Sequence, residues 1–312
     1  SGDTYRAQHT DIAAGARLSA SATDSGNGGE VVVWADQDTR FAGAIEARGG
    51  ANGGNGGRIE VSGKGTLDFL GSADAGAPRG RNGSLLLDPT DVNIGLAEAS
   101  TINRVLRTGT STAVQASNNI DVNALIDGRG YLAGGGLTLT AGNNLTINEF
   151  IVTNNGAVNL NAGNTIAFAA DKAVFAGNAA ISATTGSDLN TGSLVLVTTG
   201  TKTYRSSGGS VFVNQAFDNT NRNIAIHAAQ NVAVNQPIVN FSNGSTLDIN
   251  AGGDISVNAQ IDGRGGVAGG TATLTAGGNV LLNQSIVSNN GTLSLNAGGT
   301  LTPSGGSGLF SG

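Results

Sequence analysis

Short runs of alternating apolar and polar residues cover most of this chain. The segments at 137–142 (LTLTAG) and 158–163 (VNLNAG) are typical examples. A period of two indicates strands with one buried face. Helical spacing is nearly absent, and residues 98–106 form the one segment that predicts a short helix, which would end before Gly109. The pattern therefore predicts an all-β chain built from many short strands.

Two sequence units repeat and interleave along the chain. The first is apolar-x-apolar-Asn-x-x-apolar, and the second is apolar-x-apolar-x-Ala-Gly. A longer duplication contains both, because residues 118–166 align without a gap onto residues 253–301. The asparagines of the first unit recur at intervals of roughly 22 residues, apart from one longer gap that equals three such steps. They are Asn123, Asn148, Asn214, Asn235, Asn258 and Asn283.

A repeat of about 22 residues with two or three strands has the size of one solenoid coil. A single coil cannot bury its inward face, so coils must stack at the spacing of paired strands, about 4.8 Å. Parallel crossovers within one sheet are overwhelmingly right-handed. We therefore predict a right-handed parallel β-helix with three stacked faces, and the 312 residues would give about 14 coils.

The recurring asparagine lies where a strand must turn. Asparagine tolerates turn conformations and bonds its local backbone, and stacked asparagines can also bond one another. We predict that the six form a structural ladder at one corner of the coil, in a bend buried between neighbouring coils. A row that binds a polar ligand is the alternative interpretation. The sequence assigns no residue of the chain to a ligand.

Charge divides the chain into two regions, residues 1–98 and residues 99–312. The first holds 8 Lys/Arg and 13 Asp/Glu, and the second holds the remaining 8 and 9. The first region has its own repeat at an offset of 28 and a Gly/Asn-rich stretch at 49–57 that predicts an exposed loop. The strand pattern does not lapse at the boundary. We therefore expect regular coils over 99–312 that continue the helix of 1–98.

The first region resembles the filamentous haemagglutinin-like large exoproteins, adhesins of the two-partner secretion family. The matching residues are GGEVVVWAD at 28–36, GRIEVSGK at 57–64 and GSLLLDP at 83–89, and the match covers about the first 95 residues. The resemblance implies export from a Gram-negative bacterium through an outer-membrane pore and a place outside the cell or on its surface. The secretion domain of that family carries Asn-Pro-Asn motifs, which are absent here, so the chain is expected to lie downstream of that domain.

The composition excludes some classes of binding partner. A net charge of −6 without a basic stripe excludes nucleic acid, and no apolar run is long enough for membrane insertion. The chain has no Cys, which fits an extracellular protein but fixes no compartment. The resemblance leaves glycans, exopolysaccharide, and host or bacterial surfaces open as ligands. We expect a structural and adhesive segment that mediates attachment to cells, glycans or biofilm matrix.

Two alternatives stay open: a β-helical polysaccharide-processing enzyme and the stalk of a contact-dependent toxin protein. The best catalytic candidates are Asp127 with Arg129 and Asp262 with Arg264, but a duplicated pair is more typical of a turn than of an active site. The two histidines offer little for a metal site or a catalytic triad. We therefore expect no enzyme activity, no metal and no cofactor. Three aromatic residues could stack on sugars or pack structurally: Trp34, Tyr131 and Tyr204.

Overall fold

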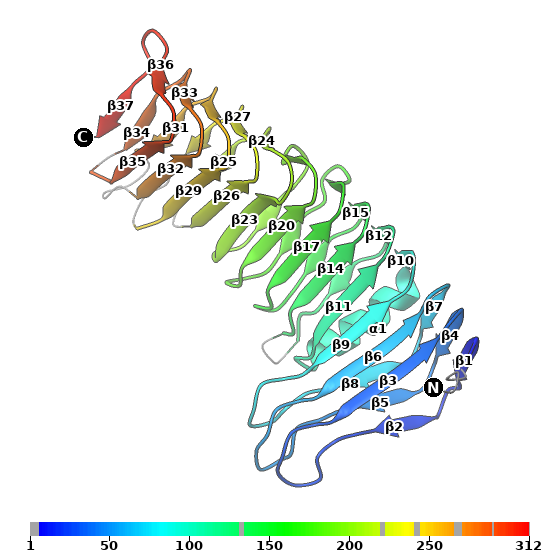
Figure 1. Ribbon diagram of the computed structural model, residues 1–312. Helices are drawn as coiled ribbons and strands as arrows, with labels where there is room; N and C mark the ends of the chain where they lie inside the picture. The colour runs from blue at the N-terminus through cyan, green and yellow to red at the C-terminus, as the bar shows by residue number, and fades with distance from the viewer. Residues whose placement is uncertain are drawn as a thin grey trace, which may run out of the picture. The chain divides into compact units, whose positions relative to one another are not determined.

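The computed structural model describes residues 6–130, 134–218, 222–239, 244–264, 270–288 and 290–311. Tyr131 lies outside these ranges. The chain is nearly all parallel β-structure, arranged as a β-solenoid of about 12 turns with coils of about 23 residues and 4% helix. Strands of successive coils lie side by side (Figure 1). The prediction of a parallel β-helix is therefore confirmed.

The chain divides into two compact units, Ser1–Asn161 with Asp171–Gly177, and Ala162–Ala170 with Asn178–Gly312. In the first unit the long sheet contains β3 (Glu30–Ala35), β6 (Arg58–Gly63), β9 (Ser84–Asp88), β11 (Ser111–Ala116), β14 (Leu137–Ala141) and β17 (Val158–Ala162). Shorter sheets form its other faces. They are β1 (His9–Ile12), β4 (Asp38–Phe41) and β7 (Leu67–Phe69); β2 (Arg17–Ser19), β5 (Ala44–Glu46) and β8 (Ser72–Asp74); β10 (Val92–Ile94), β12 (Ile120–Val122) and β15 (Leu145–Ile147); and β13 (Ile126–Asp127), β16 (Ile151–Val152) and β19 (Val174–Phe175).

The second unit repeats the arrangement. Its first sheet contains β20 (Ile181–Thr185), β23 (Thr201–Ser206), β26 (Asn223–Ala228), β29 (Thr246–Ala251), β32 (Thr271–Ala276) and β35 (Leu293–Ala297). Its second contains β21 (Leu189–Asn190), β24 (Val211–Val213), β27 (Val232–Val234), β30 (Ile255–Val257), β33 (Val280–Leu282) and β36 (Leu301–Pro303). Its third contains β25 (Phe217–Asp218), β28 (Ile238–Val239), β31 (Ile261–Gly263), β34 (Ile286–Ser288) and β37 (Leu309–Ser311). The remaining strands are β18 (Ile166–Phe168) and β22 (Leu196–Val197).

Equivalent residues of successive coils stack in register. Val232 of β27 pairs with Ile255 of β30, which pairs with Val280 of β33. All three side chains are almost fully buried. Alternation along each strand thus becomes columns of branched aliphatic side chains along the inside of the coil, which are well suited to a pleated surface. Burial of these columns is the main stabilising force of the fold.

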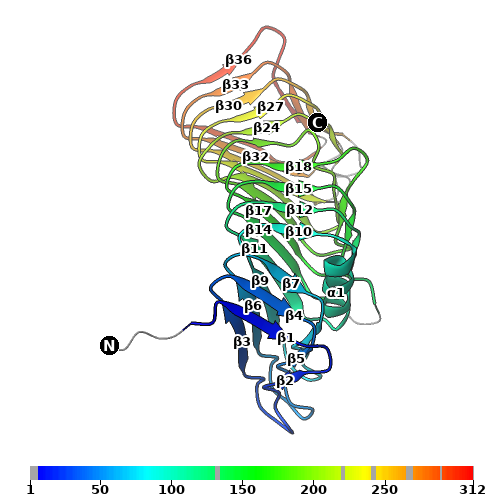
Figure 2. The same ribbon diagram turned by 90° about the vertical axis from the view of Figure 1, so that its right-hand side faces the viewer.

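One helix, α1 (Leu96–Arg107), takes the place of a third strand in its coil (Figure 2). The Glu98 carboxylate accepts a hydrogen bond from the Gly95 N–H at 3.1 Å and closes the first turn. Ala99, Ile102, Val105 and Leu106 are buried in the solenoid, and the chain leaves the helix through Gly109 at φ +84°. The predicted helix is confirmed and begins two residues earlier than expected.

The expectation of about 14 coils was wrong, because the early coils are longer than the repeat used to derive it. Arg58 pairs with Glu30 of the coil before it and with Ser84 of the coil after it. Thr201 in the second unit pairs with Asn223, which is a shorter step along the chain than either of these. The extra residues of the early coils form loops, including the stretch at 49–57. A fixed chain length therefore gives about 12 turns.

Candidate functional site

In the first unit a row of side-chain amides follows one corner of the coils. The Asn148 Nδ2 donates to Asn123 Oδ1 at 2.7 Å, and the Asn123 Nδ2 donates to Asn93 Oδ1 at 2.9 Å. The backbone is paired in the same register as the side chains, because the N–H of Asn148 donates to the carbonyl of Val122 at 2.9 Å. In this row, the asparagine of each coil therefore donates one side-chain hydrogen bond to the asparagine of the coil before it.

The second unit contains a longer row of the same kind. Asn283 donates to Asn258 at 2.7 Å, Asn258 to Asn235 at 2.8 Å, Asn235 to Asn214 at 2.9 Å, and Asn214 to Asn190 at 3.0 Å. The donor is Nδ2 and the acceptor Oδ1 in every bond. All six asparagines singled out in the sequence thus lie in amide rows, four of them in this one.

Two features of these rows differ from the sequence-based expectation. The predicted burial of the bend is wrong, because the ladder side chains are half-buried or exposed and face solvent at the corner. Each row also begins on an asparagine that the repeat does not contain. Asn93 and Asn190 lie in strands β10 and β21, two residues before Gly95 and Gly192, which occupy the corner positions of those coils. Their amide oxygens reach across the corner to the first ladder residue.

A second polar row follows another corner of the second unit, where the Ala-Gly units end. The side-chain oxygen of Asn231 accepts from the N–H of Asp254 at 2.8 Å, and Asp254 accepts from the N–H of Asn279 at 2.6 Å. Asn279 accepts from the N–H of Thr300 at 2.9 Å. Sequence reasoning missed this row, although an Asn or Asp a few residues after each Ala-Gly was a usable signal. These side chains pair corner backbone groups that no strand partner reaches.

The two Asp–Arg pairs are local turn contacts. Arg129 donates from Nε and Nη2 to the two carboxylate oxygens of Asp127 at 2.9 and 2.8 Å, and Arg264 holds Asp262 in the same way at 2.9 and 2.6 Å. The arginine hydrogen bond lowers the pKa of each carboxyl group. The arginine lies only two residues from the aspartate, so each bidentate pair is contained within one turn of the chain and holds the local backbone in place.

Both histidines stack on an aspartate of a neighbouring coil. His9 Nδ1 lies 3.1 Å from Asp38 Oδ2, and His227 Nε2 lies 2.9 Å from Asp248 Oδ2. Within the described ranges no three His, Cys, Asp or Glu side chains group closely enough to hold a metal ion. These contacts therefore link coils, as the ladders do.

The aromatic candidates divide clearly. Tyr204 is 1% exposed and stacks on Phe217 with ring centroids 4.8 Å apart, so it belongs to the core. Burial raises the pKa of its hydroxyl group. Lys202, two residues earlier, also occupies an inward position, and desolvation lowers the pKa of its ammonium group. Trp34, by contrast, faces outward from β3 and is only half-buried.

Trp34 lines a pocket of about 460 Å³ on the first unit. The indole has a cation from each neighbouring coil beside it, because the Arg6 guanidinium and the Lys64 ammonium each lie 5.4 Å from the ring centroid. Such distances fall within the range of cation–π attraction. The other lining residues are Asp88, Pro89, Thr90 and Ser117. This pocket combines an accessible aromatic ring with carboxylate and hydroxyl groups.

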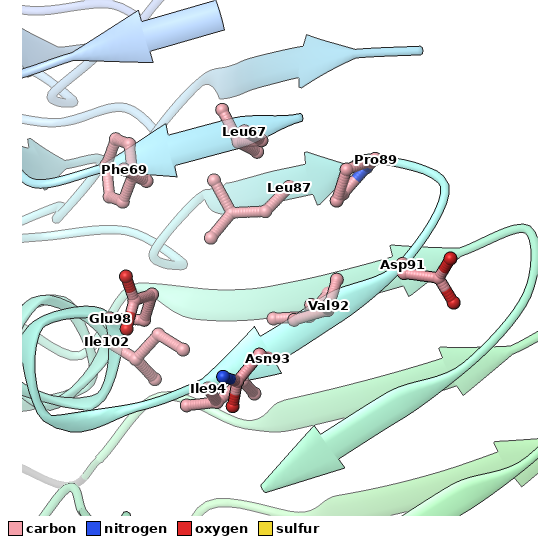
Figure 3. Close-up of a pocket in the computed structure, with 11 residues that line it drawn as sticks. Leu67, Phe69, Leu87, Pro89, Asp91, Val92, Asn93, Ile94, Glu98 and Ile102 are labelled. Carbon is pink, nitrogen blue, oxygen red and sulfur yellow. The ribbon is translucent and has the colours of Figure 1, made fainter. Parts of the chain in front are cut away.

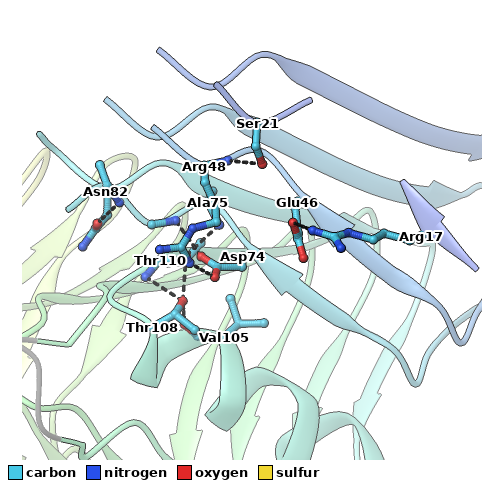
Figure 4. Close-up of polar contacts among 12 residues, drawn as sticks. Arg17, Ser21, Glu46, Arg48, Asp74, Ala75, Asn82, Val105, Thr108 and Thr110 are labelled. Carbon is cyan, nitrogen blue, oxygen red and sulfur yellow. Dashed lines mark hydrogen bonds and ion pairs between the residues drawn. The ribbon is translucent and has the colours of Figure 1, made fainter. Parts of the chain in front are cut away.

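A polar hollow of about 660 Å³ lies beside the end of α1 (Figure 4). Its main contact is the ion pair between Arg48 Nη1 and Asp74 Oδ2. Thr108 and Thr110 extend the polar network, with hydroxyl groups 2.9 Å apart, and the Thr110 hydroxyl accepts from the N–H of Ala75 at 3.1 Å. These bonds satisfy backbone groups where the helix replaces a strand, so the network has a structural role.

An apolar cavity of about 50 Å³ lies between β7 and β10 (Figure 3). These strands belong to consecutive coils but are not paired, since β7 ends one sheet and β10 begins another. Phe69 and Leu67 line one side, and Val92, Ile94 and Ile102 line the other. The volume is far below the several hundred cubic ångströms of ordinary ligand sites. The cavity is therefore a packing defect beside α1.

Within the described residues, no helix is both long and apolar enough to cross a membrane. No protein-family model matches the chain, and no curated protein is similar to it at a significant level.

Proposed function

We propose that this chain is a structural and adhesive segment of a secreted bacterial surface exoprotein, which mediates attachment to cells, glycans or biofilm matrix. The observation that carries the proposal is the pair of amide rows, in which each coil hydrogen-bonds to the next through the same residue type. A fold whose coils contact only their neighbours can be extended by adding coils. Such a segment suits a long shaft that holds binding surfaces away from a cell.

The surface chemistry supports attachment to polar surfaces. Outward positions of the first sheet of the second unit carry short polar side chains such as Thr203, Asn250 and Thr273. These present many hydrogen-bonding groups with few charges, since charged residues make up only 12% of the chain. Hydroxyl and amide groups match the donors and acceptors of carbohydrates.

Export through an outer-membrane pore is part of the proposal and rests on the resemblance of the first 95 residues. The chain contains no Cys, so folding outside the cell requires no disulfide formation. Strand pairs form between consecutive coils in register, which allows folding to advance from one coil to the next. An extracellular or cell-surface location follows from this route.

The test is a binding assay with the purified, folded chain. Immobilised chain is exposed to Gram-negative cells, to host epithelial cells and to purified exopolysaccharide, with heat-unfolded chain as the control. Saturable binding by the folded chain alone supports the adhesive role. A folded chain that binds none of the three surfaces contradicts adhesion and leaves a shaft without a ligand, as in a toxin stalk.

A further inference from the structure

Trp34 is the only tryptophan in a chain in which aromatic residues make up 4% of the sequence. In the sheet, Trp34 pairs with Ser62 of the next strand, and Ser62 pairs with Asp88 of the strand after that. The residues beside the indole therefore have small or charged side chains. The ring is half-exposed and is not part of core packing, and the Arg6 guanidinium and the Lys64 ammonium each lie 5.4 Å from its centroid. That position is suited to contact with a ligand.

Four consecutive coils build the wall of the Trp34 pocket. Trp34 lies on β3, Lys64 directly follows β6, Asp88 ends β9, and Ser117 directly follows β11. These strands lie side by side in the long sheet (Figure 1). Successive coils are about 4.8 Å apart, so the wall extends over roughly 14 Å. A linear ligand placed along this corner would meet one coil after another.

The polar groups of the pocket are mostly available. Among the described residues, neither the Asp88 carboxylate nor the Ser117 hydroxyl has a hydrogen-bond partner, and the indole N–H of Trp34 has none. The Lys64 ammonium is neutralised by Asp36 at 2.9 Å, which leaves its aliphatic stem as part of the wall. The Thr90 hydroxyl donates to the Lys64 carbonyl and can still accept.

The electrostatics disfavour an anionic ligand. Of the charged residues that line the pocket, Asp88 has no basic partner among the described residues, whereas the Lys64 ammonium is already paired with Asp36. The Arg6 guanidinium lies beside the indole but is not part of the lining. Burial raises the pKa of the Asp88 carboxyl group, and the charge of Glu60 raises it further. Carboxylates of this kind accept hydrogen bonds from hydroxyl groups and repel acidic sugars. An aromatic face beside acceptors and donors is the combination that an uncharged sugar ring uses, with C–H groups on the ring and hydroxyl groups at its edge.

We propose that the Trp34 pocket binds an uncharged, linear carbohydrate chain, with one sugar ring against the indole of Trp34 and sugar hydroxyl groups hydrogen-bonded to Asp88 and Ser117. The proposal rests on the proposed adhesive function and names its ligand class and its site. The volume of about 460 Å³ lies within the ordinary range for small-molecule sites.

Because Trp34 is the only tryptophan, its fluorescence reports on this site alone. The folded chain is titrated with hexamers of β-1,4-linked glucose, of β-1,4-linked N-acetylglucosamine and of galacturonic acid. A saturable change in emission with a neutral hexamer, at concentrations where the acidic one gives at least tenfold weaker binding, is the expected result. Unchanged emission with both neutral hexamers overturns the proposal, as does tighter binding of the acidic one.

Variants measured by calorimetry assign the residues. Trp34→Ala should reduce affinity for the neutral hexamer about tenfold or more, which corresponds to roughly 1.4 kcal/mol, and Asp88→Asn about threefold to tenfold. Val32→Ala is the matched control, because Val32 is the neighbouring outward residue of β3, is 52% exposed and does not line the pocket. Circular dichroism verifies that each variant is folded. A folded Trp34→Ala chain that binds like the Val32→Ala chain would contradict the assignment.

The outcomes separate this site from the adhesive function. If the chain binds cells or exopolysaccharide and Trp34→Ala binds equally well, adhesion stands and the site is wrong. If the hexamer binds at Trp34 but the chain binds no surface, the site stands and the adhesive role is wrong.

Discussion

The coils before α1 and the coils after it differ in the side-chain contacts that most often link them. Before the helix, ion pairs join residues 26 to 29 positions apart, as between Arg58 and Glu30 at 2.7 Å and between Lys64 and Asp36 at 2.9 Å. After it, amide rows join most coils, and the Asp–Arg contacts are confined to single turns. Among the described residues, Lys172 with Glu149 and His227 with Asp248 are the ion pairs that still link coils there.

The difference shows which side chains can repeat indefinitely in a solenoid. An amide carries both a donor and an acceptor, so asparagine can stack on asparagine through any number of coils. A carboxylate only accepts and an ammonium only donates, and like charges on adjacent strands repel each other. Ion pairs must therefore alternate in sign from coil to coil. Glu30, Arg58 and Ser84 show how quickly that alternation stops.

Core residues should contribute about equally to the free energy of unfolding in both regions, and their replacement should lower it more than any other change. Ile59 before α1 and Ile249 in the second unit are both 0% exposed. Replacement of either by Ala should lower the free energy of unfolding of the surrounding coils by about 2–5 kcal/mol, because it leaves a cavity. Hydrogen exchange of the neighbouring amides measures the loss. A difference of more than about 2 kcal/mol between the two variants would mean that the regions differ in their cores as well as in their surfaces.

Loss of a ladder residue should have a smaller effect. Asn258 donates to Asn235 and accepts from Asn283, so Asn258→Ala removes two hydrogen bonds. Because the corner faces solvent, we expect a loss of about 1–2 kcal/mol, measured by hydrogen exchange in β27, β30 and β33. Ser256→Ala, a change on the same coil that removes no ladder bond, is the control and should cost less than about 0.5 kcal/mol. Equal effects of the two changes would remove the energetic case for the ladder.

Removal of a cross-coil ion pair should cost less still and should depend on salt. Arg58→Met removes contacts with Glu30 and Glu60, both at 2.7 Å, from an exposed guanidinium. We expect a loss of up to about 1 kcal/mol at low salt. At about 1 M NaCl, where charges are screened beyond about 3 Å, the loss should nearly vanish. Urea unfolding at both salt concentrations provides the measurement, and an Asn258→Ala effect that fell with salt in the same way would contradict the distinction between the regions.

Loss of a local Asp–Arg contact should have the smallest effect on the stability of the fold, and the pH dependence of that effect should appear only at acidic pH. The Arg264 hydrogen bond holds the pKa of the Asp262 carboxyl group below its ordinary value of 3.8. A lowered folded-state pKa contributes stability that is present above the ordinary pKa and is lost as the pH falls through the folded-state value. Nuclear magnetic resonance titration should show the pKa of Asp262 rising toward 3.8 in Arg264→Met. An unchanged pKa would show that the arginine is not its cause.

Much of this architecture was predictable because each coil repeats the same pattern of apolar, polar and asparagine positions. A period of two indicated which residues face inward, and the regular interval of the asparagines indicated that they recur at a corner of their coils. Stacking then follows, since in-register parallel pairing brings each copy beside the next. The helix was predictable from residues 98–106, where the period changes.

The tertiary structure decided features that depend on neighbouring coils and have no signature of their own. Tyr204 and Trp34 both lie on strands of alternating pattern, yet one is buried against Phe217 and the other lines a pocket built by four coils. Asn93 and Asn190 accept the first ladder bonds in coils whose corner residues, Gly95 and Gly192, carry no side-chain amide. Sequence by itself determined what repeats along the chain, because periodicity is a local property. Tertiary structure decided the exposed corner, the pocket and the ends of the rows, because each depends on side chains that stacking brings together from different coils.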